Sequence, residues 1–237
     1  MSALSILGQV SGLYKERKSS GCVQDNGFCP GWIVENFDQY VEPFVEHVVL
    51  TVVALSIGFA IAFALALFAH RQRWLVGPIG AGTNLLYTIP SIAAFLLLLP
   101  LTGRGNLTAL VVLVAYSLTF MFTNTVTGLA NVPREVTDSA RGQGLTENQM
   151  LWKVEVPLAV PEIFAGLRIA ATTTVGLVAL AFYAGAGGLG AEILTDLYFK
   201  SNVVVAGGLC VLLAAALDLV FLAGQKLLTP WARARAS

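Results

Sequence analysis

Long runs of apolar residues with at most one charged residue recur along the chain from residue 48 onward. A bilayer core about 30 Å thick needs about 20 apolar residues in each helix that crosses it. Five runs approach this requirement, so we expect five transmembrane helices, with boundaries good to a few residues. These runs cover residues 48–69, 75–101, 107–129, 169–190 and 203–224. The pattern predicts an all-α integral membrane protein.

The two ends of the chain set the expected domain division and orientation. We expect residues 1–31 to form an extracytoplasmic tail and residues 32–237 to form the transmembrane domain. Lys and Arg are enriched in the cytoplasmic loops of membrane proteins. If five spans alternate in direction, nine of these residues fall on one side and five on the other. We therefore expect the N-terminus outside and the C-terminus in the cytoplasm.

The composition supports a protein that lies in lipid. Hydrophobic residues make up 56% of the chain and charged residues 12%, whereas a soluble domain is about 25% charged. Lys and Arg together number 14, and so do Asp and Glu, which gives a formal net charge of zero. These values argue against a disordered chain, an ordinary cytosolic enzyme and a nucleic-acid-binding protein.

Two cysteines lie in the polar tail. Cys22 and Cys29 are separated by a segment that contains Gly and Asn, which allows a tight loop. An extracytoplasmic tail would permit a disulfide between them, and two free thiols remain an equal alternative. A metal site is not expected, because a closed site needs four ligands and no His lies near.

The most polar part of the membrane half lies between the third and fourth expected spans, at residues 130–168. Its first part, residues 133–141, reads as a short helix with Glu135 near its start and Arg141 near its end, as the helix dipole favours. Gly142 and Gly144 follow, and a glycine at a helix end can adopt the left-handed conformation. We therefore expect this helix to stop at a glycine turn.

A second short helix is expected at residues 147–154. Thr146 and Gln149 have the spacing of a capping box, which marks a helix start. Pro157 favours a stop before it. Two short helices joined at a glycine turn suit docking into a groove of another protein, and a structured linker against the membrane is the alternative.

The same segment resembles the "EAA" loop of binding-protein-dependent ABC transporter permeases. That loop reads Glu-Ala-Ala, three residues, Gly, nine residues, Ile, one residue and Leu-Pro, and this chain keeps the spacing in full. The departures are Asp for Glu, Ser for Ala, and Val for both Ile and Leu. The resemblance implies that the matching residues belong to a loop that couples the permease to an ATPase. These residues are Asp138, Ser139, Ala140, Gly144, Val154, Val156 and Pro157.

Further segments resemble the osmoprotectant branch of these permeases, whose substrates are glycine betaine, choline, carnitine and similar solutes. They are Tyr87–Phe95 (YTIPSIAAF), Gly185–Gly190 (GAGGLG) and the ending Thr229–Trp231 (TPW). Resemblance covers most of the chain from about Phe44 onward. It implies a permease like those of type I ABC importers, in a bacterial inner or plasma membrane.

The resemblance also implies partners. The chain contains no Gly-x-x-x-x-Gly-Lys-Ser/Thr sequence that could hold ATP phosphates. We therefore expect no cofactor on this chain, with ATP and Mg²⁺ bound by separate P-loop ATPase subunits. The other expected partners are a second permease copy or a homologous permease, an extracytoplasmic solute-binding protein, and membrane lipid.

Two places are candidates for the solute pathway or its gate. Pro90 should kink the second span, where Thr88 and Ser91 can satisfy freed carbonyls, although a packing kink is an equal alternative. Gly187 and Gly190 should let a helix end and turn near the outer face. Their Gly-x-Gly-x-x-Gly spacing follows a membrane run rather than a strand, so dinucleotide binding is rejected.

Other polar residues point to structure more than to chemistry. Asp218 is the one carboxylate inside an expected span, and we favour a structural pairing or access to water for it. His47 and His70 flank the first span at opposite ends, so they cannot form one metal or catalytic site. No arrangement of Ser, His and Asp points to an enzyme.

Three alternative functions remain open. A secondary transporter or channel would need no ATPase, but ion coupling calls for several charges inside the membrane. An ABC permease could serve another small solute such as an amino acid. A membrane scaffold would show no transport.

Overall fold

The computed structural model describes residues 21–230, and within this range the chain is helical with no strand. In chain order the helices are α2 (Gly21–Gln24), α3 (Pro30–Glu35), η1 (Phe37–Tyr40), α4 (Val41–Arg71), η2 (Arg73–Leu75), α5 (Val76–Thr88), α6 (Ser91–Thr102), α7 (Asn106–Ala130), α8 (Arg134–Gly142), α9 (Glu147–Met150), η3 (Leu151–Glu155), α10 (Val156–Leu180), η4 (Ala181–Ala184), α11 (Leu189–Thr195) and α12 (Lys200–Leu228).

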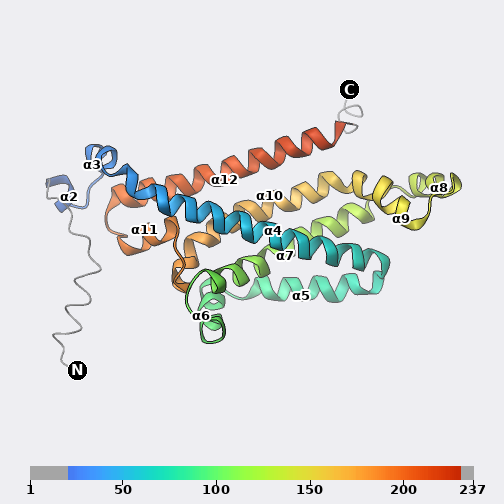
Figure 1. Ribbon diagram of the computed structural model, residues 1–237, viewed down its shortest axis with the longest axis horizontal. Coiled ribbons are helices and arrows are strands. Elements are labelled where there is room, and N and C mark those ends of the chain that lie inside the picture. The colour runs from blue at the N-terminus through green and yellow to red at the C-terminus, as the bar shows by residue number, and fades with distance from the viewer. Residues whose placement is uncertain (1–20, 231–237) are drawn as a thin grey trace.

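Four long helices form the body of the molecule and run along its longest axis (Figure 1). Helix α7 packs against both α4 and α10, and α10 also packs against α12. In the described part of the chain, four helices are long and apolar enough to cross a membrane, or five if the bent pair α5 and α6 forms one span. The all-α membrane architecture predicted from the apolar runs is therefore confirmed.

The two ends of this body differ in what they carry. Helices α8 and α9 extend from one end, and α2 and α3 lie at the other, near α11 (Figure 1). We call these the α8–α9 end and the α2–α3 end. Helix α4 runs between them, with its first turns near α3 and its last turns toward α9.

The second expected span, residues 75–101, is not one helix. It divides into α5 and α6, which meet at an angle of 96°. Ile89 and Pro90 between them are extended, with ψ angles of 129° and 130°. Proline has no N–H and disfavours the helical conformation in the residue before it, so Pro90 breaks this run instead of kinking it.

The fourth expected span, residues 169–190, is displaced toward the N-terminus. Helix α10 covers Val156–Leu180, and the helical stretch continues back through the π-helical turn η3 to α9. The helix that we expected to stop before Pro157 therefore passes through it. Pro157 lies in the first turn of α10, where its missing N–H costs little. The expected coupling loop of residues 130–168 is irregular only before Glu147.

The start of the described chain is attached to the helical body. Residues 21–31, assigned from the sequence to a tail, pack against the beginning of α12. Val23 and Cys29 are buried beside Phe199, and the backbone N–H of Cys29 donates to Ser201 Oγ at 2.7 Å. Cys22 and Cys29 are joined in a disulfide. Residues 1–20 of the expected tail and Trp231 of the final motif lie outside the described residues.

Candidate functional site

The turn after α8 has the conformation that a helix-ending glycine provides. Gly144 has a φ of +83°, and its N–H donates to the carbonyl of Arg141 at 3.0 Å. The N–H of Leu145 reaches back to the carbonyl of Ala140 at 3.3 Å, which completes a Schellman motif. A Cβ on Gly144 would meet no atom within 4 Å. The glycine is therefore required by backbone conformation and not by close contact within this chain.

The start of α9 confirms the predicted capping box. The N–H of Gln149 donates to Thr146 Oγ1 at 3.3 Å, and the N–H of Thr146 donates to Gln149 Oε1 at 3.0 Å. This reciprocal pair satisfies two of the N–H groups that a helix start leaves free. Helices α8 and α9 thus form a short hairpin, which we call the α8–α9 hairpin (residues 134–150).

The residues matched to the "EAA" pattern divide into two groups. Asp138, Ser139 and Gly144 are exposed on the α8–α9 hairpin, and Ala140 is buried beneath them. The remaining three are half-buried in the continuous helix that follows, and they are Val154, Val156 and Pro157. Asp138, Ser139 and Gly144 are therefore the matched residues that are most exposed to a partner protein.

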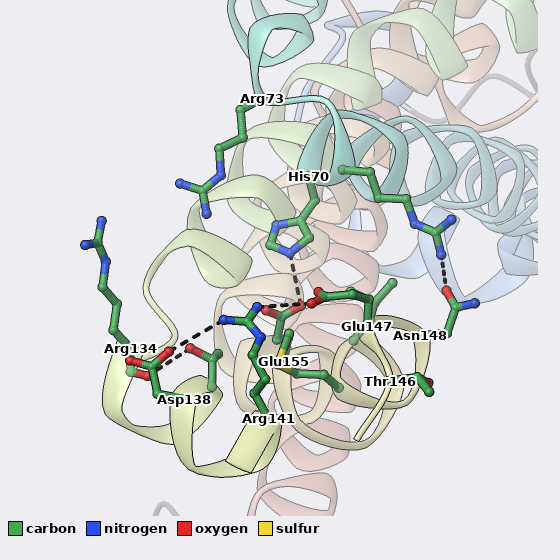
Figure 2. A pocket seen from close by; sticks show the side chains of 13 residues that line it. His70, Arg73, Arg134, Asp138, Arg141, Thr146, Glu147, Asn148 and Glu155 are labelled. Carbon is green, nitrogen blue, oxygen red and sulfur yellow. Dashed lines mark hydrogen bonds and ion pairs between the residues drawn. The ribbon is translucent and has the colours of Figure 1, made fainter. Parts of the chain in front are cut away.

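A cavity of about 770 Å³ lies beneath the hairpin, between α8, α9, η3 and the end of α4 (Figure 2). Arg141 projects across it, with its guanidinium 3.1 Å from Glu147 and 3.7 Å from Asp138. These side chains are largely exposed, so each ion pair contributes at most about 1 kcal/mol. The cavity leaves the hairpin loosely packed on the body of the protein.

The cavity is also lined by a His–Glu pair that the sequence does not predict. His70 lies in the last turn of α4 and Glu155 ends η3, and their Nε2 and Oε2 atoms lie 3.0 Å apart (Figure 2). The neighbouring Arg71 donates to the side-chain oxygen of Asn148 on α9. Neither contact follows from sequence spacing, because the partners are distant along the chain.

At the α2–α3 end the glycine-rich segment 185–190 packs tightly. The N–H of Gly188 donates to Glu46 Oε2 at 3.0 Å. A Cβ on Gly187 would lie 1.9 Å from the same oxygen, and a Cβ on Gly190 would lie 1.9 Å from the backbone carbonyl oxygen of Ala179. Gly185 and Gly188 have positive φ angles. The chain ends one helix and turns here, but it turns at Gly185 and Gly188 and not at Gly187 and Gly190, since Gly190 lies within α11.

The break between α5 and α6 has its carbonyls satisfied from two sources. Thr88 Oγ1 donates to the carbonyl of Leu85 at 2.7 Å, as the sequence predicts. The hydroxyl of Tyr116 on α7 donates to the carbonyl of Ile89, a contact between residues 27 positions apart that sequence spacing does not reveal. Ser91 begins α6 directly after the break.

Aromatic rings border the same break. The ring of Tyr87 lies 5.6 Å from that of Tyr116 and 5.0 Å from that of Phe120, in steep edge arrangements. Tyr87 is exposed, whereas Phe95 and Phe122 are buried in the core. Of the aromatic residues in the second and third runs, Tyr87 is therefore the one exposed at the break, whereas Tyr116 beside it is buried.

Asp218 has the structural pairing that we favoured. Its two carboxylate oxygens accept from Arg168 Nε at 2.7 Å and Nη2 at 2.9 Å, which joins α10 to α12. Within residues 21–230, no group of His, Cys, Asp and Glu is arranged to hold a metal ion.

Comparison with known proteins gives one consistent result. Residues 54–234 match the family described as "Binding-protein-dependent transport system inner membrane component". The osmoprotectant import permease protein OsmW of Salmonella typhimurium is 39% identical over 70% of this chain and 80% of its own length. The glycine betaine/carnitine/choline transport system permease protein OpuCD of Bacillus subtilis is 31% identical over 83% and 87%.

A solved structure extends this similarity to three dimensions. The inward-facing MetNI methionine ABC transporter contains a chain that superposes with a TM-score of 0.68. The two chains are 25% identical, and the match covers 84% of this chain and 96% of that one.

Proposed function

The chain belongs to the family of binding-protein-dependent transport system inner membrane components, and from this premise we propose that it carries osmoprotectants such as glycine betaine, choline or carnitine through a bacterial inner membrane. It is the permease subunit of an ATP-binding cassette importer. The observation that carries the choice of solute is the similarity over most of both chains to permeases named for these compounds.

We further propose that the α8–α9 hairpin is the surface that receives energy from the ATPase subunits. Asp138 and Ser139 are exposed on α8, and the positive φ of Gly144 sets the angle at which α9 follows. The cavity beneath the hairpin supports this role, because a loosely packed element can move without disrupting the core. The partner subunits bind ATP and Mg²⁺, and this chain supplies the hairpin that they move.

The orientation in the membrane is part of the same proposal. The α8–α9 end faces the cytoplasm, where ATP is available, and the α2–α3 end faces the solute-binding protein outside. The Cys22–Cys29 disulfide supports this direction, because disulfides persist in oxidising compartments. A second permease, identical or homologous, completes the pathway.

For the solute we propose a route past the break between α5 and α6. Thr88, Pro90 and Ser91 surround the break, and the exposed ring of Tyr87 lies next to it. Aromatic faces attract quaternary ammonium groups, which the proposed solutes share. Gly187 and Gly190 lie in the tightly packed segment 185–190 at the α2–α3 end, where a gate would close.

Transport by the reconstituted complex tests this proposal. The permease, its ATPase and its solute-binding protein would be placed in liposomes, and uptake of labelled glycine betaine, choline and methionine would be followed with and without ATP. We expect ATP-dependent uptake of the quaternary ammonium compounds. Uptake of methionine alone would favour an amino-acid permease, the function of the MetNI transporter. Uptake against a gradient without the ATPase would indicate a secondary transporter.

A further inference from the structure

Glu155 is an unusual residue within the described part of the chain, because it is the one carboxylate among the buried residues, with 9% of its surface exposed. It ends the π-helical turn η3, between the α8–α9 hairpin and the long helix α10. Isolated π-helical turns inside a longer helix often mark functional positions. A buried carboxylate is costly unless it is paired, so its partner needs an explanation.

The partner is His70 in the last turn of α4. Because a carboxylate only accepts, the imidazole Nε2 carries the proton and donates it to Glu155 Oε2 across 3.0 Å. Arg71, the next residue, bonds Asn148 on α9, and the ring of Trp152 lies 6.2 Å from that of Phe63 on α4. The end of α4 is thus tied to the segment that follows the hairpin. We call the His70–Glu155 contact the clasp.

The clasp lies between cavities and not in a closely packed core. Two cavities adjoin it, of about 770 and 350 Å³, and both are lined by His70 and Glu155. Helix α8 faces the end of α4 across the larger one, through Asp138 and Arg141 (Figure 2). Because the cavities leave little side-chain packing between the hairpin and α4, motion of the hairpin is transmitted to α4 mainly through the hydrogen bonds that join them.

The opposite end of α4 holds the proposed gate. Glu46 accepts the N–H of Gly188 at 3.0 Å, and His47 Nε2 lies 3.0 Å from the carbonyl oxygen of Val175 in α10. Helix α4 is continuous over Val41–Arg71 and has no break between these contacts and the clasp. Because every turn of a continuous helix is hydrogen-bonded to the next, displacement of one end of α4 is transmitted to the other.

We infer that Glu155 is a positioning residue for energy coupling, which acts by clasping His70 so that α4 follows the α8–α9 hairpin and moves the Gly185–Gly190 turn. This inference rests on the proposed function, because it needs a hairpin that the ATPase displaces. Glu155 contacts neither ATP nor solute. Its role is to keep two helices together while one of them is pushed.

The test compares variants of the clasp in the reconstituted complex. Uptake of labelled glycine betaine and hydrolysis of ATP are measured in the same liposomes, so that solute moved per ATP can be calculated. Glu155→Leu and His70→Phe are expected to lower this ratio about tenfold, whereas co-purification with the ATPase and the hydrolysis rate stay unchanged. The matched control is Glu162→Leu on α10, since the Glu162 carboxylate has no hydrogen bond or ion pair among the described residues.

Two rescue variants separate positioning from general damage. Glu155→Gln keeps an oxygen that accepts from the imidazole, so we expect it to retain most of the coupling. The exchange of both residues, His70→Glu with Glu155→His, restores the bond in reverse, and we expect it to recover the ratio lost by either single change. Because the ratio is calculated only for complexes that co-purify with the ATPase, a loss of folding is recorded separately from a loss of coupling.

Each outcome decides the inference. Unchanged solute uptake per ATP in Glu155→Leu would overturn it, and so would failure of the exchanged pair to recover transport in an assembled complex. If Glu155→Leu does not assemble, His70→Phe and the exchanged pair decide by the same ratio. Absence of ATP-driven uptake by the unmodified complex is a distinct result, because it removes the proposed function and the clasp with it.

Discussion

The two ends of the molecule are built in contrasting ways. At the α8–α9 end the polar hairpin carries exposed ion pairs and covers a cavity of about 770 Å³. At the α2–α3 end the backbone of segment 185–190 touches its neighbours closely, and hydrogen bonds from the Tyr40 hydroxyl and the Cys29 N–H hold η1 and the segment before α3 to the start of α12. The first end is suited to being moved by a partner, and the second to holding one arrangement until the helices move.

Replacement of a tightly packed glycine tests this contrast with the largest expected effect. In Gly190→Ala the new Cβ would lie 1.9 Å from a backbone oxygen of α10, which cannot move aside as a flexible side chain can. We expect a loss of about 3 kcal/mol in stability, measured as a fall in the midpoint of thermal unfolding in detergent. Gly176→Ala is the control, because its Cβ would meet no atom within 4 Å. Equal midpoints for the two variants would show that the α2–α3 end is not tightly packed.

At the α8–α9 end, the effect of replacing a glycine should depend only on its backbone conformation. Gly144 has a positive φ and Gly142 lies in helix α8, and a Cβ on either would meet no atom within 4 Å. We expect Gly144→Ala to cost about 1–2 kcal/mol. ATP-driven uptake should also fall, because α9 leaves the turn at a changed angle. Gly142→Ala, with helical geometry that alanine favours, should transport normally. Normal uptake by both variants would contradict a docking role for the turn.

Removal of the helix cap gives the smallest expected effect. Thr146→Ala deletes the hydroxyl that accepts the N–H of Gln149, at a cost of about 1 kcal/mol. Because the hairpin is loosely held, the loss should appear as faster amide hydrogen exchange confined to residues 146–150. Thr146→Ser, which keeps the hydroxyl, is the matched variant. Faster exchange throughout α10 would mean that the hairpin and the long helix are one unit, and the contrast between the ends would be weaker.

Much of the fold follows from local properties of the chain. The apolar runs at residues 48–69, 107–129 and 203–224 lie within α4, α7 and α12, because an apolar run of this length can cross lipid only as a helix that bonds its own backbone groups. The capping box at Thr146 and the turn at Gly144 also agree, because each depends on residues a few positions apart.

Other features depend on contacts that sequence spacing does not reveal. Pro90 was expected to kink a helix, but two extended residues in succession break it completely. Pro157 was expected to end a helix, but the π-helical turn before it lets the helix continue. The clasp joins residues 85 positions apart, and it arises only when α4 and α10 pack together. The α8–α9 hairpin could therefore be predicted from local sequence, whereas its attachment to α4 could not, because that attachment depends on residues distant along the chain.

Cross-linking from single positions tests the central claim most directly, namely that the α8–α9 hairpin is where the ATPase delivers energy. A photoreactive residue would be placed at Ser139, exposed on α8, or at Val34, 80% exposed on α3 at the other end. In membranes that contain the whole importer, position 139 should cross-link to the ATPase subunit and position 34 should not. Cross-linking of the ATPase from position 34, with none from position 139, would contradict the account.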